Sequence, residues 1–294
     1  MMRTHHLTFV LLLGLPAGAC AEINGGESIN WWAADSDWIV RGTLTEVWTT
    51  KTASGTAWNK ASVKVSETLK GKHIHHATFS GGQRDGGEAA VAMKAAGTEM
   101  LLFLSGKGVE TTGERGLGIA DVALRNQWGR ASFVTLDDKP ATHVFTTDFK
   151  LLKKHDEILT AVRDAVKVQA MHDKPAKHTV NVPFSTPAHQ VLYAGSSVFL
   201  VVAADASLEA HAHRWIKSTD VEQRATGVRS LQHFKSEENI ERLQPLLADP
   251  GFWTSSDGDG RNKRRVYAVR GAAFETLRTW GVEVEKPVVE EPLD

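Results

Sequence analysis

Near its C-terminal end the chain reads Val221-Glu-Gln-Arg-Ala-Thr-Gly-Val-Arg-Ser-Leu-Gln-His-Phe234, and further on Val266-Tyr-Ala-Val-Arg-Gly-Ala-Ala-Phe-Glu-Thr-Leu-Arg-Thr-Trp-Gly281. The two segments match at one constant offset, which pairs Arg224 with Arg270, Gly227 with Ala273, Leu231 with Leu277, and Phe234 with Trp280. A small residue on a helix lets a neighbouring helix approach closely, and large apolar residues fill the groove between paired helices. The match therefore predicts two helices that pack against their neighbours in the same way.

Two further helices are predicted beside these, over residues 206–217 and 237–248, which gives two helix pairs. Residues suited to cap a helix N-terminus stand before three of the four helices, and a Pro-Gly pair stops the third helix. These residues are Asp205, Asp220, Ser236, Pro250 and Gly251. Because two pairs fall short of the roughly three repeats that a helical array needs for independent stability, we expect the module to dock on the segment before it.

Acidic residues and arginines recur in both helix pairs. Asp220 and Asp249 each follow the preceding helix, and Arg224 and Arg270 lie on the helices that come next. In this, residues 205–281 resemble the HEAT repeat. The resemblance implies that an inter-helix Asp and a helix-borne Arg brace the turn, and that the helical surface binds other proteins. An ordinary four-helix cap with accidental similarity is the alternative.

A long insertion separates the two helices of the second pair, over residues 250–265. Insertions in repeat proteins lie together on one surface and often bind a partner. The residues that we expect to contact a partner are Trp253, Asp257, Asp259, Arg261, Lys263, Arg264 and Arg265.

The same insertion contains two weaker patterns. Asp257-Gly258-Asp259-Gly260 resembles calcium loops, in which clustered carboxylates suit a hard cation, but basic residues stand where an EF-hand needs further acids. A solvated loop is therefore favoured over calcium binding. The triplet Lys263-Arg264-Arg265 suits phosphate or an acidic partner, although such triplets more often solvate the start of a helix.

The first residues form a targeting signal. Arg3 precedes the apolar run Leu7-Thr-Phe-Val-Leu-Leu-Leu-Gly-Leu15, and Ala17-Gly18-Ala19 offers a small-residue cleavage site, with a second one before Glu22. We expect a signal peptide over residues 1–19 and export to the periplasm, cell envelope or extracellular space. Cys20 follows small residues as in bacterial lipoprotein signals, so a lipid anchor at Cys20 is one alternative and free release is the other. No later stretch approaches the roughly 20 apolar residues of a membrane-spanning helix, so none is predicted.

Residues 20–137 are predicted to form a β-rich domain. Short runs of β-branched and aromatic residues, separated by glycine-rich turns, favour a small barrel or sandwich. The runs that begin at Trp38, Val63 and Gly97 resemble the netrin and tissue-inhibitor-of-metalloproteinase type of OB barrel. The resemblance implies an OB-like β-barrel. Because the animal members are stapled by disulfides and this chain has one cysteine, it implies no protease inhibition. The expected strands are residues 38–48, 57–69, 73–80, 100–104, 117–124 and 131–136.

Residues 138–204 are predicted to form a mixed α/β connecting segment. We expect a helix at 155–170, a strand at 178–182, a short helix capped by Thr186 with Pro187 in its first turn, and a buried strand at 198–202. Parallel pairing of the two strands across the short helix is left open. With helical repeats at 205–282 and a flexible tail at 283–294, the predicted fold class is α+β multidomain: an OB-like barrel, a connecting segment and a HEAT-like repeat.

Composition and motifs exclude several function classes. The formal net charge is −1 over 294 residues, so no global positive field attracts nucleic acid. The chain contains no nucleophile elbow, His-Glu-x-x-His helix, phosphate loop or dinucleotide fingerprint. We therefore assign no catalytic residue, metal ligand or cofactor.

Some side chains suit a ligand but have a simpler explanation. His73 and His75 are expected on one face of a strand, where an exposed edge is favoured over a metal site because no third ligand is recognisable. His211 and His213 do not face each other on a helix and are expected at the surface. Tryptophans in the β domain suit sugar stacking, but core packing is favoured. They are Trp31, Trp32, Trp38, Trp48 and Trp58.

The leading hypothesis is an exported, non-enzymatic binding or scaffolding protein that uses its HEAT-like surface to bind another envelope protein. Two alternatives stay open. One is an exported hydrolase or metal-dependent enzyme with a site between the domains. The other is a barrel that binds a glycan or another small ligand.

Overall fold

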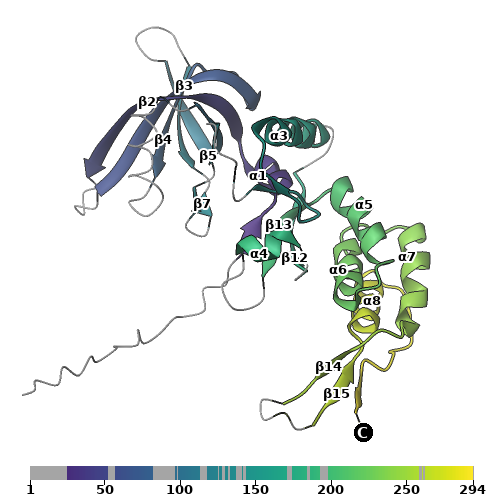
Figure 1. The fold of residues 1–294 in the computed structure, drawn as a ribbon. Helices are drawn as coiled ribbons and strands as arrows, with labels where there is room; N and C mark the ends of the chain where they lie inside the picture. Colours follow the sequence, from purple (N-terminus) through teal and green to yellow (C-terminus); the bar gives the residue numbers. More distant parts are fainter. Residues whose placement is uncertain are drawn as a thin grey trace, which may run out of the picture.

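The computed structural model describes residues 25–51, 57–81, 97, 99–112, 118–124, 126–127, 130–131, 133–136, 141, 144–170, 174–183, 186–192, 198–257, 260 and 262–293. The fold is α+β, with the β-rich part at one end of the molecule, a small mixed sheet in the middle, and helices with a terminal sheet at the other end (Figure 1). Within these residues, no helix combines the length and apolar character needed to cross a bilayer. The signal peptide and Cys20 lie outside the described residues.

The β-rich part is built on one six-stranded sheet with the order β2-β3-β4-β6-β5-β9, in which β2 also pairs with β5. The pairs are antiparallel except β4 with β6. The predicted alternation on the second strand is confirmed at Ala61 and Val63, which are both buried, with the half-buried Ser62 between them. The strands are β2 (Trp38–Lys51), β3 (Ala57–Lys70), β4 (His76–Gly81), β5 (Glu99–Thr112), β6 (Gly118–Leu124) and β9 (Phe133–Thr135), beside a two-stranded pair of β7 (Asn126–Gln127) and β8 (Arg130–Ala131).

A short helix, α1 (Ile29–Asp35), precedes the sheet where the sequence indicated none. Ser28 caps it, since its hydroxyl accepts a hydrogen bond from the backbone N of Trp31 at 3.1 Å. Trp31 and Trp32 are both buried, and the ring of Trp32 meets that of Phe103 edge-on at 5.1 Å. These two tryptophans therefore serve core packing, as expected, and present no face to a sugar.

The middle of the molecule is a three-stranded sheet with the order β1-β13-β12. Strands β12 and β13 are antiparallel, so the parallel arrangement left open by the sequence does not occur between them. The backbone N of Val182 donates to the carbonyl of Val198 at 3.0 Å, which continues the pairing into the connection as in a hairpin. The parallel neighbour of β13 is β1. The elements of this part are β1 (Gly25–Glu27), β10 (Val144–Phe145), β11 (Leu151–Leu152), α3 (His155–Ala170), β12 (Ala176–Asn181), α4 (Pro187–Leu192) and β13 (Phe199–Ala204).

Helices follow in the predicted order: α5 (Ala206–Trp215), α6 (Val221–Leu231), α7 (Glu237–Leu243), the 3-10 helix η1 (Gln244–Ala248) and α8 (Ala268–Thr279). The three predicted N-caps are confirmed, since the side chains of Asp205, Asp220 and Ser236 each accept a hydrogen bond from a backbone N–H of the first turn. The predicted third helix is divided, because it tightens into η1 where Pro245 enters.

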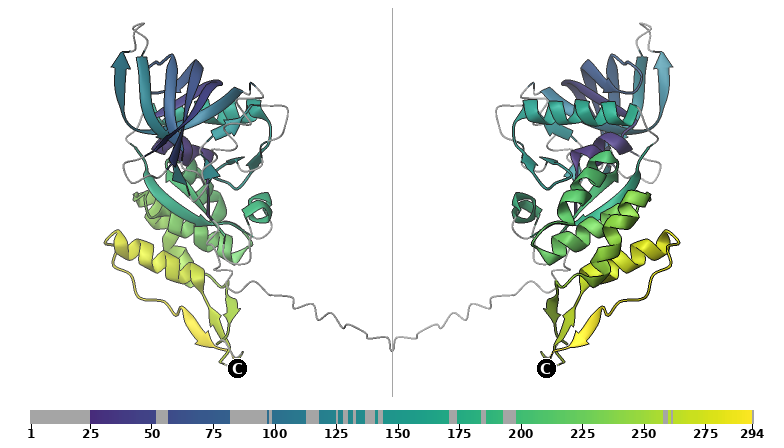
Figure 2. Two further views of the ribbon diagram at one scale, coloured as in Figure 1. Left: turned by 90° about the vertical axis from the view of Figure 1, so that its left-hand side faces the viewer. Right: turned by 90° about the vertical axis from the view of Figure 1, so that its right-hand side faces the viewer.

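The insertion and the C-terminal tail together form a small sheet beyond the helices (Figures 1 and 2). Strands β14 (Trp253–Ser255) and β15 (Arg264–Val266) form a hairpin, and β16 (Glu290–Pro292) pairs with the other side of β15. Residues 283–294 were expected as a flexible tail, whereas residues 290–292 are a strand. Backbone bonds from Tyr267 to Val289 and from Leu293 to Lys263, both 2.8 Å, hold this end in register.

The helical module docks on the mixed sheet, as its small number of repeats predicted. Leu208 and Trp215 of α5 share a core with Val180 of β12 and with Leu200 and Val202 of β13. A separate core inside the module holds the matched residues Leu231, Ala273 and Leu277, all fully buried. Helix α5 contributes to both cores, through Leu208 and Trp215 on one side and Ala212 on the other, and Phe234 packs against both.

Gly227→Ala is expected to lower the free energy of unfolding by about 1–3 kcal/mol, the usual range for overpacking. A Cβ at Gly227 of α6 would lie 2.8 Å from the backbone N of Ile216 and 2.9 Å from Trp215 Cβ, at the end of α5. Gly271→Ala on α8 is the matched control. The nearest atom to its Cβ would be Val289 Cγ1 at 3.7 Å, so the gain in helix propensity, up to about 1 kcal/mol, is expected to prevail. Urea unfolding measures the free energy of unfolding of both variants. A Gly227→Ala protein more stable than the wild type would contradict the close approach of α5 and α6.

Candidate functional site

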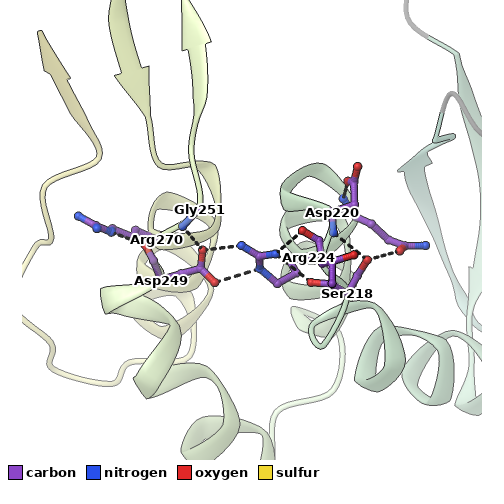
Figure 3. A network of polar contacts seen from close by, with 8 residues as sticks. Ser218, Asp220, Arg224, Asp249, Gly251 and Arg270 are labelled. Atoms are coloured by element: carbon purple, nitrogen blue, oxygen red, sulfur yellow. Dashed lines mark hydrogen bonds and ion pairs between the residues drawn. The ribbon is translucent and has the colours of Figure 1, made fainter. Parts of the chain in front are cut away.

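Asp249 lies between two arginines at the junction of the helix pairs (Figure 3). Arg224 donates to it from two nitrogens, Nε to Oδ2 at 3.0 Å and Nη2 to Oδ1 at 2.9 Å, and both side chains are largely buried. From the other side, Arg270 Nε donates to the backbone carbonyl of Asp249 at 2.7 Å. Asp249 Oδ1 also accepts from the backbone N of Gly251 at 2.8 Å. One residue thus joins α6, the end of η1 and α8.

The two matched arginines both bond to backbone carbonyls, but they differ in their other side-chain contacts. Each donates to a backbone carbonyl just after the helix that precedes its own: Arg224 to Ser218 and Thr219, after α5, and Arg270 to Asp249, after η1. Only Arg224 also binds a carboxylate among the contacts described. Arg270 instead lies 3.7 Å from the ring centre of Tyr267 and donates to the carbonyl of Val288 in the tail.

Asp220 is a helix cap, and in the contacts described its side chain bonds to neither arginine. Its Oδ1 accepts from the backbone N of Gln223 at 2.7 Å. The pairing of an inter-helix Asp with a helix-borne Arg is therefore found at Asp249 with Arg224, across the two pairs. The sequence predicted an Asp and an Arg at each turn; the structure pairs Asp249 with Arg224, whereas the side chain of Asp220 caps α6.

Phe252 and Trp253 are exposed at the edge of the terminal sheet, with 42% and 39% of their surface accessible. The Phe252 ring meets Tyr267 edge-on at 5.8 Å, and the guanidinium of Arg265 lies over Phe252 at 5.1 Å. With Arg270 beyond Tyr267, cations and aromatic rings alternate along this face. These contacts hold one side of Phe252 and leave its other side exposed.

The basic triplet is largely neutralised by the tail. Arg264 pairs with Glu290 at 3.3 Å, and Arg265 pairs with Glu291 at 2.9 Å. The Tyr267 hydroxyl donates to Glu291 Oε1 at 2.5 Å, and this bond, followed by the one from Arg265, holds the pKa of Glu291 below its usual range. Both arginines are therefore paired with carboxylates of the tail, a contact that neither interpretation of the triplet included, whether contact with phosphate or an acidic partner or solvation of a helix start. The sequence reading missed these pairs because it treated the tail as flexible.

The remaining candidates at the insertion are polar and exposed. Asp257 accepts a hydrogen bond from Asn262 Nδ2 at 2.6 Å, and Lys263 is exposed. Together with Glu290 and Glu291 they line an open hollow of about 810 Å³. Asp259 and Arg261 lie outside the described residues.

The histidine candidates are placed differently from the expectation. His73 and His75 lie in the turn after β3, not on a strand, with ring centres 4.8 Å apart. His211 stacks on Trp215, and His213 Nε2 hydrogen-bonds Asn239 Oδ1 at 2.7 Å, so both are half-buried and not simply surface residues. Burial lowers the pKa of His211. Among the described residues, no group of three or more His, Cys, Asp or Glu side chains is placed to hold a metal ion.

A cavity of about 300 Å³ lies where α3, the end of β13 and the start of α5 meet. Its carboxylates are Asp205 and Glu209, and both have structural partners. Asp205 caps α5, while Glu209 Oε1 accepts from Asn239 Nδ2 at 2.9 Å. Burial raises the pKa of Asp205. The residues described around this cavity include no Ser, Cys or His.

No protein-family model matches the chain, and no curated protein matches it either.

Proposed function

We propose that the protein is an exported, non-enzymatic binding or scaffolding protein, and that another envelope protein contacts its helices α5–α8 and terminal sheet. The observation that carries this proposal is the exposed pair Phe252 and Trp253 on an edge held in place by Asp249 and the tail. Large exposed apolar side chains that gather at one place mark interaction sites, and Trp is enriched among the residues that dominate binding energy.

The two edges of the terminal sheet differ, and the difference supports a contact along β14. The outer strand β16 carries Glu290, Glu291 and Pro292, which are the residue types that block strand addition. The opposite outer strand, Trp253-Thr254-Ser255, has neither a charge nor a proline. An extended segment of a partner can therefore add to β14 through backbone hydrogen bonds while Trp253 packs against its side chains.

The finer fold assignments belong to the same proposal. For an OB-like barrel, the support is the series of pairings from β2 through β3, β4, β6 and β5 back to β2, as in a five-stranded Greek-key barrel. For a HEAT-like module, it is the two helix pairs and the bond between Arg224 and Asp249. For export, with or without a lipid on Cys20, it is the arrangement of the first 20 residues.

Replacing both Phe252 and Trp253 with serine is expected to reduce capture of the partner at least about tenfold, because losing a dominant aromatic contact costs about 2 kcal/mol or more. The full chain is expressed in its own cells, cross-linked and recovered, and captured proteins are quantified by mass spectrometry. Val288→Ser is the matched control, because Val288 is 57% exposed in the same unit but lies outside the β14 edge. Equal capture by wild type and by a folded double variant would contradict the proposal.

A further inference from the structure

Three polar side-chain atoms converge where β12 meets the end of α6. His178 Nδ1 lies 3.1 Å from His233 Nε2 and 3.3 Å from Gln232 Nε2, and the last two atoms are 3.2 Å apart. His178 is buried, whereas Gln232 and His233 are exposed. The three atoms thus form a nearly equilateral triangle with one side open to solvent.

Ser230 fixes the proton of His178. Its hydroxyl donates to the backbone carbonyl of Thr226 at 2.9 Å, so toward His178 Nε2, at 3.4 Å, Ser230 can only accept. Nε2 of His178 therefore carries the ring proton, and the lone pair of Nδ1 points into the triangle.

Hydrogen bonds alone cannot satisfy all three edges. If Gln232 donates one proton to each imidazole, two nitrogen lone pairs face each other at 3.1 Å. The alternative is that His233 Nε2 carries a proton and donates it to His178 Nδ1. If the amide nitrogen of Gln232 then faces the triangle, its protons repel the proton of His233. If the amide oxygen faces the triangle, it repels the lone pair of His178 Nδ1. One edge is repulsive in every arrangement, and a cation at the centre turns all three contacts attractive.

We propose that this triangle binds one divalent first-row transition-metal ion through His178 Nδ1, His233 Nε2 and the amide oxygen of Gln232. Rotation of the amide by half a turn exchanges its oxygen and nitrogen, which have nearly the same size. In tetrahedral coordination, an ion about 2.0–2.1 Å from each ligand atom holds those atoms roughly 3.3 Å apart. The three distances between the side-chain atoms here, 3.1 to 3.3 Å, are close to this value. Imidazole ligands select zinc, nickel or copper, and Cu²⁺ binds more tightly than Zn²⁺ in the general order of affinities.

The surroundings of the triangle fit this assignment. Ser230 acts as the outer partner that orients a ligating histidine. The third ligand is an amide, so the site differs from a cluster of three His, Cys, Asp or Glu residues.

A bound ion would join two parts of the molecule. His178 belongs to the mixed sheet, whereas Gln232 and His233 end the helix α6. The backbone carbonyl of Gln232 also accepts from Trp280 Nε1 at 3.0 Å, which connects the site to the residue that follows α8. Metal binding is therefore expected to stabilise the docking of the helical unit on the sheet.

The test uses the full chain, freed of metal with EDTA and titrated calorimetrically with CuCl₂ and with ZnCl₂. One ion per chain is expected, with Cu²⁺ tighter than Zn²⁺. His233→Ala is expected to abolish this binding, and Ser230→Ala to weaken it about tenfold or more. Arg229→Met is expected to strengthen it, because a positive charge that lowers the pKa of His178 also repels the ion. Electron paramagnetic resonance of the Cu²⁺ form should show two imidazole nitrogens.

The matched control removes the other close imidazole pair of the described residues, His73 and His75, by alanine substitution of both. This control is expected to leave the affinity unchanged. Because His233 is exposed, its variant is expected to fold, and circular dichroism checks this. No stoichiometric binding by the wild type, or binding retained by His233→Ala and lost in the control, would overturn the assignment.

Discussion

Asp249→Ala is expected to lower the free energy of unfolding by about 3–5 kcal/mol, the cost of breaking a buried ion pair by removing one partner. Asp249 and Arg224 have side chains only 7% and 14% exposed, and the guanidinium would lose both of its carboxylate bonds. The substitution also removes the acceptor of the Gly251 backbone N–H. Urea unfolding followed by far-ultraviolet circular dichroism measures the effect.

Two other aspartate variants serve as controls for this prediction. Asp257→Ala removes an exposed carboxylate in the same insertion, so a change within about 0.5 kcal/mol is expected. Asp249→Asn keeps one oxygen for Arg224, so its loss of unfolding free energy is expected to lie between those of Asp257→Ala and Asp249→Ala. An Asp249→Ala protein as stable as the Asp257→Ala protein would show that the junction contributes little.

Trp280→Ala is expected to cost about 3–5 kcal/mol, the usual range for removing a buried large aromatic side chain. Trp280 is 7% exposed and packs in the core of the helical unit. Its indole N–H also donates to the backbone carbonyl of Gln232, which would lose a partner. Because Trp280 joins the end of α8 to the end of α6, thermal and urea unfolding should both report the loss.

Phe234→Ala is expected to cost clearly less than Trp280→Ala, although the two positions match in the repeated segments. Phe234 is half-buried and lies between the core of the helical unit and the core of the mixed sheet. Trp253→Ala is a control for the loss of a tryptophan at an exposed position, with a change of about 0.5 kcal/mol expected. Equal losses of unfolding free energy in Trp280→Ala and Trp253→Ala would contradict the packing described for α8.

The predictions from sequence were most accurate for helix starts and strands, which depend on residues close together in the chain. Asp205, Asp220 and Ser236 each act within three residues of the backbone that they cap, and all three helices begin where the caps indicated. The strands β2 to β4 likewise followed from alternation and turn residues. Helix α1 was not predicted, because a short apolar run such as Trp-Trp-Ala-Ala is equally typical of a buried strand. Its N-cap, Ser28, is the one local signal for a helix.

The sequence could not predict contacts between distant segments. Strand β16 pairs with β15 across more than twenty residues of chain, where Glu290 and Glu291 also meet Arg264 and Arg265, and a pairing at this separation cannot be predicted from the tail alone. For the same reason the sequence did not reveal that Arg264 and Arg265 are paired with carboxylates of the tail. The convergence of His178 with His233 likewise depends on how α6 docks on β12, which no spacing in the sequence reveals.

These contacts give the C-terminal unit a consistent physical role. Asp249 joins the two helix pairs, and the tail completes the sheet that carries Phe252 and Trp253. An exposed aromatic pair binds well only if its supporting structure is rigid, because ordering it on binding would cost free energy. The proposed binding role therefore depends on the helix pairs acting as one frame.

The most direct test of this frame is the coupling free energy between Arg224 and Asp249, measured with both alanine variants and their combination. If the pair joins the two helix pairs, the loss of unfolding free energy in the double variant should be smaller than the sum of the two single losses by roughly 2–3 kcal/mol, which is the coupling. A coupling near zero would mean that the two side chains act independently, and the frame that is proposed to position Trp253 would be contradicted.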